Sequence, residues 1–466
     1  MLKFTGLDTT YPVAQGGNRK RIHLDGAASP LACDVAQEAI TTLLPHYSNT
    51  HSYVHTSAKI STYALNWAHQ KILDVFNAKH DVYTTIFSGA GCTASINRVA
   101  RGLAQSRSNK NVVLVSSMEH HANDLPHRSI GNTIEYLPLE GEGVNQGIID
   151  LVATQALLEK HQGKVNYIAI SSVSNVTGVI NPVSEITKLA HQYDALVLVD
   201  AAQSVAHMPL DLSTETAPDF VVFSGHKLYS PLSPGVLVAK KEILNTMPGQ
   251  DLGGGSVEDV TYQDFIMLDD YPDREESGTP NILGGIALAK VMKSLDEIGF
   301  ESIYQHDSQL LEKLRIKLSG MNNIQVYADP ALPRIGAISF NHLEIDHGLL
   351  SAILNDYFCI AVRNGCFCAH PYVSSMLKNE LWNIDLSEIP DDQQQAVVNR
   401  KRGMVRASIS LYNTDEDVEK LMDALIQIDR DINEYQDCYE AQFDGSYRHK
   451  TFHPNWNEKW HSLLDD

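Results

Sequence analysis

ALVLVDAAQS, at residues 195–204, and DFVVFSGHK, at residues 219–227, decide the fold, because each is an almost unbroken apolar run that ends in polar side chains. Further runs of this kind are VYTTIFSG (82–89), NVVLVSS (111–117), VNYIAISSVS (165–174) and GVLVAK (235–240). Such runs, separated by stretches of helical length, are typical of a mostly parallel sheet with helices on both faces. We therefore expect an α/β fold whose ligands bind beyond the carboxyl ends of the strands.

The pattern changes near residue 285, where amphipathic helix gives way to the strand-like run IGAISFNHL (335–343) and then to helix again. The expected organisation is an N-terminal segment, a large α/β domain, a smaller α+β domain and a tail, at residues 1–20, 21–285, 286–440 and 441–466. We expect the N-terminal segment to fold back onto the smaller domain. The polar stretch 377–402, within an insertion at about 373–402, is interpreted as lying at the surface.

Composition excludes several classes of protein. The 466 residues include 36 Lys and Arg against 57 Asp and Glu, a net charge of −21, which argues against a nucleic-acid partner. No run approaches the roughly 18 apolar residues of a membrane span, and the start of the chain lacks a signal-peptide core, so we expect a cytoplasmic protein. Six cysteines are too sparse for a disulfide framework. The tail histidines His449, His453 and His461 are expected at the surface.

Polar groups at several strand ends suit one cofactor. Asp200 directly follows an apolar run, where a carboxylate needs a positive partner such as a protonated ring nitrogen. Lys227 follows the next strand, beside Ser224 and His226, and can link to an aldehyde while its neighbours donate to a phosphate. The segment FSGAGCTASIN (87–97) combines a strand, a glycine-rich turn and a helix N-terminus, which is a phosphate site.

Two more strand ends add an imidazole in EHHAND (119–124) and an amide in SNVTG (174–178). An aspartate, a lysine and a helix N-terminus together indicate pyridoxal 5′-phosphate. Taken singly, each signal has an ordinary structural interpretation, such as a turn-capping Asp or a packed His. Only their joint placement favours the cofactor.

From LDGAASP through the last helices, at about residues 20–430, the sequence resembles the class V (fold type I) pyridoxal-phosphate enzymes. Within them it is similar to the cysteine desulfurases, a group that includes selenocysteine lyases. The resemblance implies a Schiff-base lysine at Lys227, a pyridinium partner at Asp200, a stacking residue at His120 and a phenolic-oxygen contact from Gln203. It places the phosphate cup at Cys92, Thr93, Ser224 and His226. It places substrate contacts at Ala28, Asn175, Arg363 and Arg406, and it leaves the phenolic oxygen of the cofactor as an alternative partner of Asn175.

The resemblance also implies a homodimer with shared active sites, because Thr279, in SGTPN, matches the threonine that reaches the phosphate of the other subunit. His55, in YVHTSA, is a further candidate neighbour of the site.

The segment AVRNGCFCAHPY (361–372) indicates which reaction the enzyme catalyses. In the desulfurases the nucleophilic cysteine lies five residues after an arginine, and here Arg363 is followed at that spacing by Cys368. A thiolate there would attack the sulfur of L-cysteine, leaving L-alanine and a persulfide for an acceptor protein. The Arg-flanked setting favours a reactive thiol over a buried structural one.

Three departures from the family pattern leave alternatives open. Cys366 stands where many desulfurases have histidine, and the Gly-Cys-Phe-Cys run is similar to the molybdenum-cofactor sulfurases, so Cys366, Cys368 or a relay between them is a candidate nucleophile. The 373–402 insertion is longer than in the bacterial desulfurases of the assembly type. The protein that accepts the sulfur therefore need not be the one that those enzymes use. Cys92 replaces a hydroxyl in the phosphate cup.

Other functions also remain. The chain is alternatively an aminotransferase, epimerase, selenocysteine lyase or other lyase of this fold, with incidental cysteines. A zinc site at Cys366, Cys368 and His370 is disfavoured, because the cysteine spacing is too short and no second pair exists.

Overall fold

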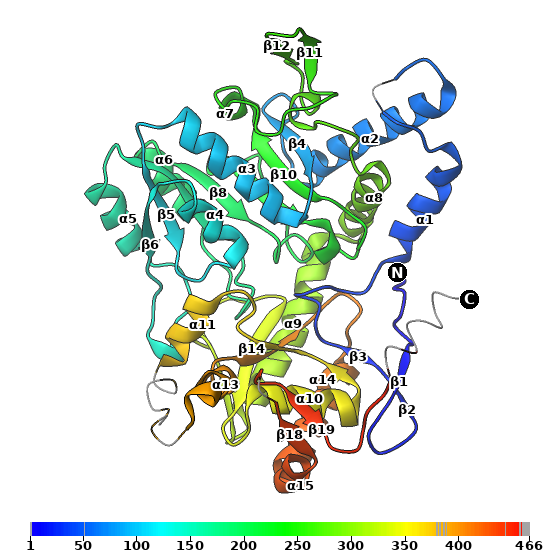
Figure 1. Cartoon of the computed structure of the whole chain (residues 1–466), viewed down its shortest axis with the longest axis vertical. Coiled ribbons are helices and arrows are strands. Elements are labelled where there is room, and N and C mark those ends of the chain that lie inside the picture. The colour runs from blue at the N-terminus through cyan, green and yellow to red at the C-terminus, as the bar shows by residue number, and fades with distance from the viewer. Residues whose placement is uncertain are drawn as a thin grey trace.

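The computed structural model describes residues 2–455, except 51, 379–380, 382–383, 385–386, 388 and 443, together with residue 458. A seven-stranded sheet occupies the upper part of the molecule in Figure 1, in the order β4-β10-β9-β8-β7-β5-β6. Its strands are β4 Tyr83–Ser88, β5 Val112–Ser116, β6 Thr133–Leu137, β7 Val165–Ser171, β8 Leu196–Asp200, β9 Phe220–Ser224 and β10 Gly235–Lys240. The expected α/β class with a mostly parallel sheet is confirmed, and only β10 runs antiparallel to its neighbours within this sheet.

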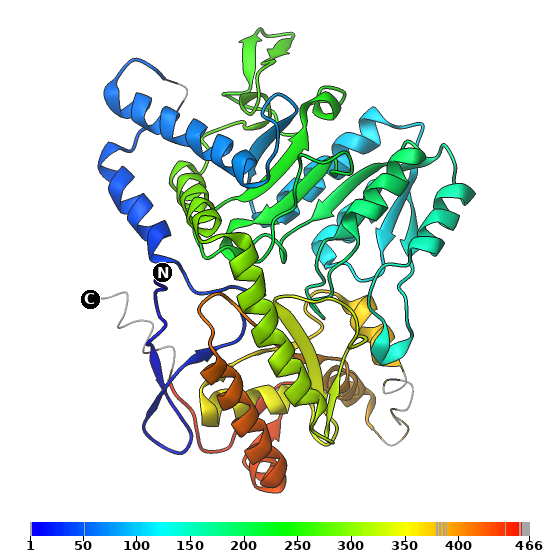
Figure 2. The ribbon, with the colours of Figure 1, turned by 180° about the vertical axis from the view of Figure 1, so that it is seen from behind.

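Helices cover both faces of this sheet (Figures 1 and 2). They are α1 Asp34–Leu43, α2 Thr56–Val75, α3 Gly91–Ser106, α4 Leu125–Arg128, α5 Leu151–Lys160, α6 Val183–Gln192, α7 Lys241–Leu244 and α8 Ile282–Ile298. Side chains alternate along β8: Leu198 packs in the cluster of α3, whereas Val197 and Val199 pack in the cluster that contains α2, α6 and α8. Because neighbouring side chains of a strand point to opposite faces, this alternation buries the strand on both sides.

A four-stranded antiparallel sheet forms the lower part of the molecule, in the order β13-β14-β17-β16. Its strands are β13 Ile324–Val326, β14 Ala337–His342, β16 Arg363–Gly365 and β17 Met404–Ser408. The helices that belong to this part are α9 Phe300–Ser319, α10 His347–Phe358, α11 His370–Met376, α13 Asp391–Lys401, α14 Asp415–Arg430 and α15 Ile432–Asp437. The strand β3, Ile22–His23, pairs with β15, Ile360–Ala361, and within the expected N-terminal segment the Ala14 N–H donates to the Asp356 carbonyl at 2.7 Å.

The remaining strands form small hairpins: β1 Thr10–Pro12 with β2 Asn18–Lys20, β11 Val257–Val260 with β12 Phe265–Met267, and β18 Tyr439–Ala441 with β19 Tyr447–His449. Figure 1 shows the β11–β12 hairpin projecting from the top of the molecule. The expected domain limit at 285/286 falls within α8, and the domain limits remain a proposal. Among the described residues, no helix is both long enough and apolar enough to cross a membrane.

The polar stretch 373–402 and the tail are described in part. Residues 379–380, 382–383, 385–386 and 388 of the stretch, and His461 in the tail, lie outside the described residues. The expectation of a surface position is wrong for His449, which is only 6% exposed and whose Nε2 lies 2.9 Å from the Tyr357 hydroxyl. The tail hairpin packs on α10, and this contact buries the ring. His453 is exposed, as expected.

Candidate active site

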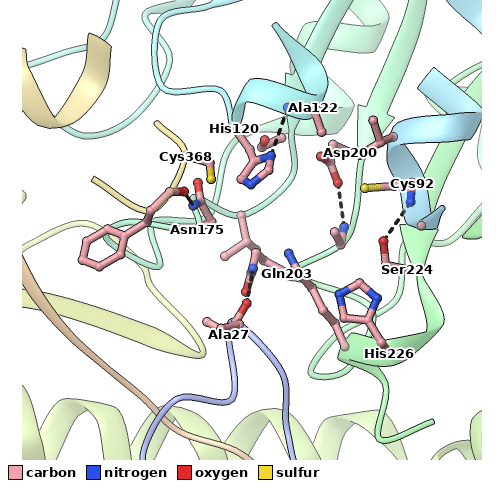
Figure 3. Close-up of a pocket in the computed structure, with 18 of the residues that line it drawn as sticks. Ala27, Cys92, His120, Ala122, Asn175, Asp200, Gln203, Ser224, His226 and Cys368 are labelled. Atoms are coloured by element: carbon pink, nitrogen blue, oxygen red, sulfur yellow. Dashed lines mark hydrogen bonds between the residues drawn. The ribbon is translucent and has the colours of Figure 1, made fainter. Parts of the chain in front are cut away.

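A cavity of about 530 Å³ lies at the carboxyl ends of the parallel strands, and residues of both sheets line it (Figure 3). The predicted site residues along its wall are Ala28, Cys92, Thr93, His120, Asn175, Asp200, Gln203, Ser224, His226, Lys227, Arg363, Cys368 and Arg406. Figure 3 shows the side chains of Cys368, His120 and Asp200 around the same hollow. Strands of one parallel sheet end at one edge, so residues distant in sequence meet there.

Asp200 is the last residue of β8, and Lys227 ends the short turn Gly225–Lys227 after β9. Asp200 is 5% exposed, and its Oδ1 accepts a hydrogen bond from the Ala202 N–H at 2.9 Å. Burial raises the pKa of Asp200, while the positive charge of Lys227 and the Ala202 N–H oppose that rise. The cavity therefore contains a buried carboxyl group that a cationic ligand would stabilise.

Helix α3 begins at Gly91, directly against the turn after β9. The Cys92 N–H donates to the Ser224 hydroxyl at 2.8 Å. Gly91 has a φ of +59°, and a Cβ there would lie 2.8 Å from Ser224 Oγ, so glycine keeps this corner open. Burial raises the pKa of the Cys92 thiol to about 12, which keeps it neutral, and burial lowers the pKa of His226. A helix N-terminus can hold a phosphate.

His120 precedes the short turn His121–Asn123, and its Nδ1 accepts from the Ala122 N–H at 3.0 Å. Burial, followed by the charge of Lys227, lowers the pKa of His120 to about 4, so the ring is neutral near pH 7. Because Nδ1 accepts, the proton of the neutral ring lies on Nε2. The residue offers the cavity a flat face and one donor.

Glu119, beside it, was not selected from the sequence. Its buried carboxylate accepts from Ser116 Oγ at 2.6 Å, Asn123 Nδ2 at 2.7 Å, Ser171 N at 2.8 Å and Ser171 Oγ at 2.6 Å. Burial raises its pKa to about 7 despite these four donors. Glu119 joins the ends of β5 and β7 to the turn that carries His120, and an acid three residues after a buried strand was the available sequence signal.

The opposite wall carries the arginines. Arg406, on β17, is 3% exposed; its Nη1 donates to Asn175 O at 2.7 Å and its Nη2 to Asp25 Oδ1 at 3.4 Å. Burial lowers the pKa of Arg406 to about 10, and the group stays charged at neutral pH. Arg363 Nη1 lies 3.7 Å from the other Asp25 oxygen. Asp25 was not selected from the sequence, although it lies within the LDGAASP motif.

The two loop cysteines have different surroundings. Cys368 is exposed and lines the cavity, whereas Cys366 is buried and does not line it. The Cys366 thiol donates to the Arg402 carbonyl at 3.2 Å, and burial raises its pKa. Geometry therefore separates two thiols that the sequence left as alternative nucleophiles.

Gln203 lies on the cavity wall, and two other predicted residues, Thr279 and His55, lie outside the cavity. Gln203 Nε2 donates to Ala27 O at 2.8 Å along the cavity wall. Thr279 is exposed and His55 accepts from the Ala58 N–H at the start of α2; neither lines the cavity. Across the described part of the chain, no three His, Cys, Asp or Glu side chains gather as a metal site.

Comparisons with known proteins agree with this arrangement. Residues 22–421 match the family model described as Aminotransferase class-V. A cysteine desulfurase of Cronobacter sakazakii is 32% identical, with 88% of this chain and 93% of that protein covered. A probable cysteine desulfurase of Halalkalibacterium halodurans is also 32% identical, with 87% and 92% covered.

Solved structures match as well. The apo cysteine desulfurase of Thermococcus onnurineus has a TM-score of 0.76 at 28% identity, covering 88% of this chain and 94% of that one. The cysteine desulfurase CsdA of Escherichia coli, in an S-sulfonic acid form, has a TM-score of 0.73 at 26% identity, covering 89% and 95%. With a family model matched over most of its length and relatives above 30% identity, the chain belongs to the class-V aminotransferase family.

Proposed function

We propose that the chain is a pyridoxal-phosphate-dependent cysteine desulfurase that converts L-cysteine to L-alanine and keeps the sulfur as a persulfide on Cys368. The observation that carries the proposal is the lining of one cavity by Lys227, Asp200, Cys368 and Arg406. The first two suit the cofactor, and the last two suit an amino acid whose sulfur is removed. Curated relatives named cysteine desulfurases support the same reaction.

The residues present fit pyridoxal 5′-phosphate. Asp200 is a buried carboxyl that a protonated ring nitrogen would stabilise, and the open corner at Gly91 with the Ser224 hydroxyl suits a phosphate. Lys227 would hold the aldehyde carbon, and His120 offers a flat face for the ring. When bound, the cofactor supplies an electron sink for the bonds at the substrate α-carbon.

The chain's own groups bind the amino acid and move its protons. The Arg406 guanidinium suits a two-point grip on the substrate carboxylate, and the Asn175 amide is a second donor close by. The Lys227 Nζ is the group best suited to carry a proton to and from the substrate α-carbon. Most of these groups are at least partly buried, which keeps water from competing for the same hydrogen bonds.

Cys368 takes the sulfur. Its thiolate attacks the sulfur of L-cysteine, a sulfur–sulfur bond forms, and the carbon–sulfur bond of the substrate breaks. The carbon skeleton keeps the electron pair, gains a proton at the β-carbon and leaves as L-alanine. The balance is L-cysteine plus Cys368–SH giving L-alanine plus Cys368–S–SH, without an external oxidant.

We also propose that the enzyme works as a homodimer and passes its sulfur to an acceptor protein. Thr279 is exposed and lies off the cavity of its own subunit, which agrees with a contact to the partner's phosphate. Cys368 is exposed as well, as a sulfur donor must be.

The proposal is tested with the cofactor-loaded protein and L-cysteine. Borohydride should trap the cofactor on the peptide that holds Lys227, and mass spectrometry should find a cysteine-dependent persulfide on Cys368. Cys368→Ser should lower alanine release by at least about 100-fold, and the matched variant Cys366→Ser should keep most of it. Trapped cofactor without any persulfide would overturn the desulfurase reaction. It would favour one of the other reactions of class V enzymes instead.

A further inference from the structure

The loop that carries Cys368 adopts an unusual backbone conformation. Phe367 and Cys368 have φ values of +52° and +54°, a left-handed region that residues with side chains rarely occupy and almost never in succession. Such a conformation persists only where surrounding contacts hold it. Asn175 Nδ2 donates to the Phe367 carbonyl at 2.7 Å (dashed at Asn175 in Figure 3), and the His121 N–H donates to the Cys368 carbonyl at 2.6 Å.

The ring of Phe367 lies against the Arg406 guanidinium. The Arg406 Cζ is 4.8 Å from the ring centroid, whereas the next charged partner, Asp25, is bound at 3.4 Å by Nη2. The buried Arg406 Nε has no hydrogen-bond partner among the residues that the structure describes. The guanidinium is therefore held by the Asn175 carbonyl, by Asp25 and by the aromatic ring, and its Nε keeps donor capacity.

A ring on the face of a guanidinium does not compete with a carboxylate, because the N–H groups point outward in the guanidinium plane. The contact fixes the plane and leaves the Nε edge, which has no partner among the described residues, available. The same loop thus orients the arginine and presents the thiol.

We propose that Phe367 is a positioning residue, whose ring sets the plane of the Arg406 guanidinium for the α-carboxylate of the substrate and so ties carboxylate binding to the loop that presents Cys368. The proposal rests on the proposed function, and it adds a residue that selects amino acids over simple amines. Without the ring, the guanidinium is free to tilt toward Asp25, and the carboxylate grip weakens.

The test compares two ligands on the cofactor-loaded protein, followed by the absorption of the bound cofactor. L-alanine carries the carboxylate without the sulfur, and ethylamine lacks the carboxylate. Phe367→Leu should weaken L-alanine binding about 5- to 10-fold, the loss of one desolvated cation–π contact, and leave ethylamine binding unchanged. Phe367→Tyr, which keeps the ring, should restore L-alanine binding to within about 2-fold.

Phe358→Leu is the matched control, because Phe358 also lies against an arginine, Arg19, at 6.0 Å and away from the cavity. It should change neither ligand. Equal weakening of both ligands by Phe367→Leu, or no weakening of L-alanine, would overturn the positioning role. Absence of the Cys368 persulfide together with the expected ligand difference would instead overturn the desulfurase reaction and leave the role of Phe367 in place.

Discussion

Lys227 and Cys368 line the same cavity, but the chain holds them there in different ways. Lys227 follows β9, in which every residue is buried, so the packed core fixes the backbone that carries it. Cys368 follows the short, mostly exposed strand β16, on two left-handed residues. Two hydrogen bonds to loop carbonyls and one ring contact hold it.

This difference divides the expected consequences of substitution. At the strand ends, a side chain that lines the cavity can be replaced while the backbone stays in position, so the variant loses the chemistry of that side chain but keeps its fold. In the loop, substitutions change how a reactive group is presented. Measurements that separate rate, stability and binding therefore show which kind of region a residue belongs to.

Asp200→Asn should give the largest effect. Loss of the carboxylate that would pair with the cofactor nitrogen should cost about 3–4 kcal/mol, or roughly 100- to 1000-fold in kcat for alanine release. Burial raises the pKa of Asp200, so the charged form is disfavoured in the folded protein. Urea unfolding of the cofactor-free variant should therefore show equal or slightly higher stability. A stability loss with a nearly normal kcat would assign Asp200 to the core instead.

Glu119→Gln should have the opposite profile, with stability as the main loss. Its carboxylate accepts four hydrogen bonds, and an amide NH₂ would face some of those donors. We expect a loss of about 2–3 kcal/mol in the free energy of unfolding, measured with urea at pH 7.

The matched control is Glu135→Gln, at a surface pair with Lys160, which should cost less than about 1 kcal/mol. Equal losses at the two positions would show that Glu119 does not join the strand ends.

The strand-end residues were predictable because the apolar runs predict buried strands, and the carboxyl ends of parallel strands meet at one edge of the sheet. Asp200, Lys227 and His120 all follow such runs and line one cavity. The antiparallel direction of β10 was not predictable, because an apolar run such as GVLVAK carries no sign of direction.

For the part of the site around the cysteine loop, the sequence predicted which residue types are present but not how their side chains are arranged. The choice between Cys366 and Cys368 depends on the backbone that turns one thiol toward Arg402 and the other toward the cavity. Asp25 and Arg406 are 381 residues apart in sequence, and no local pattern connects them. Tertiary contacts decide these features.

His120→Gln tests the strand-end side through pH. The pKa of His120 is lowered to about 4 from an ordinary value of 6.5, so the unfolded chain binds more protons between these values. The stability from the neutral ring is complete above pH 6.5 and is lost as the pH falls toward 4. The difference in unfolding free energy between the natural protein and the variant should shrink by about 1–2 kcal/mol from pH 7 to pH 4.5, after allowance for partial exposure. Parallel pH curves would contradict a buried, neutral His120.

Cys366→Ser should have the smallest effect, although it lies two residues from the proposed nucleophile. A serine hydroxyl can replace the thiol as donor to the Arg402 carbonyl, so the loss should be about 1 kcal/mol or less in unfolding free energy. Persulfide formation should stay within about 2-fold, because the thiol that faces the cavity is unchanged. Loss of the Cys368 persulfide in a stably folded Cys366→Ser protein would mean that sulfur passes through both cysteines. The contacts that hold Phe367 and Cys368 in their left-handed conformation would then oppose any movement of the loop that the transfer between the two thiols needs.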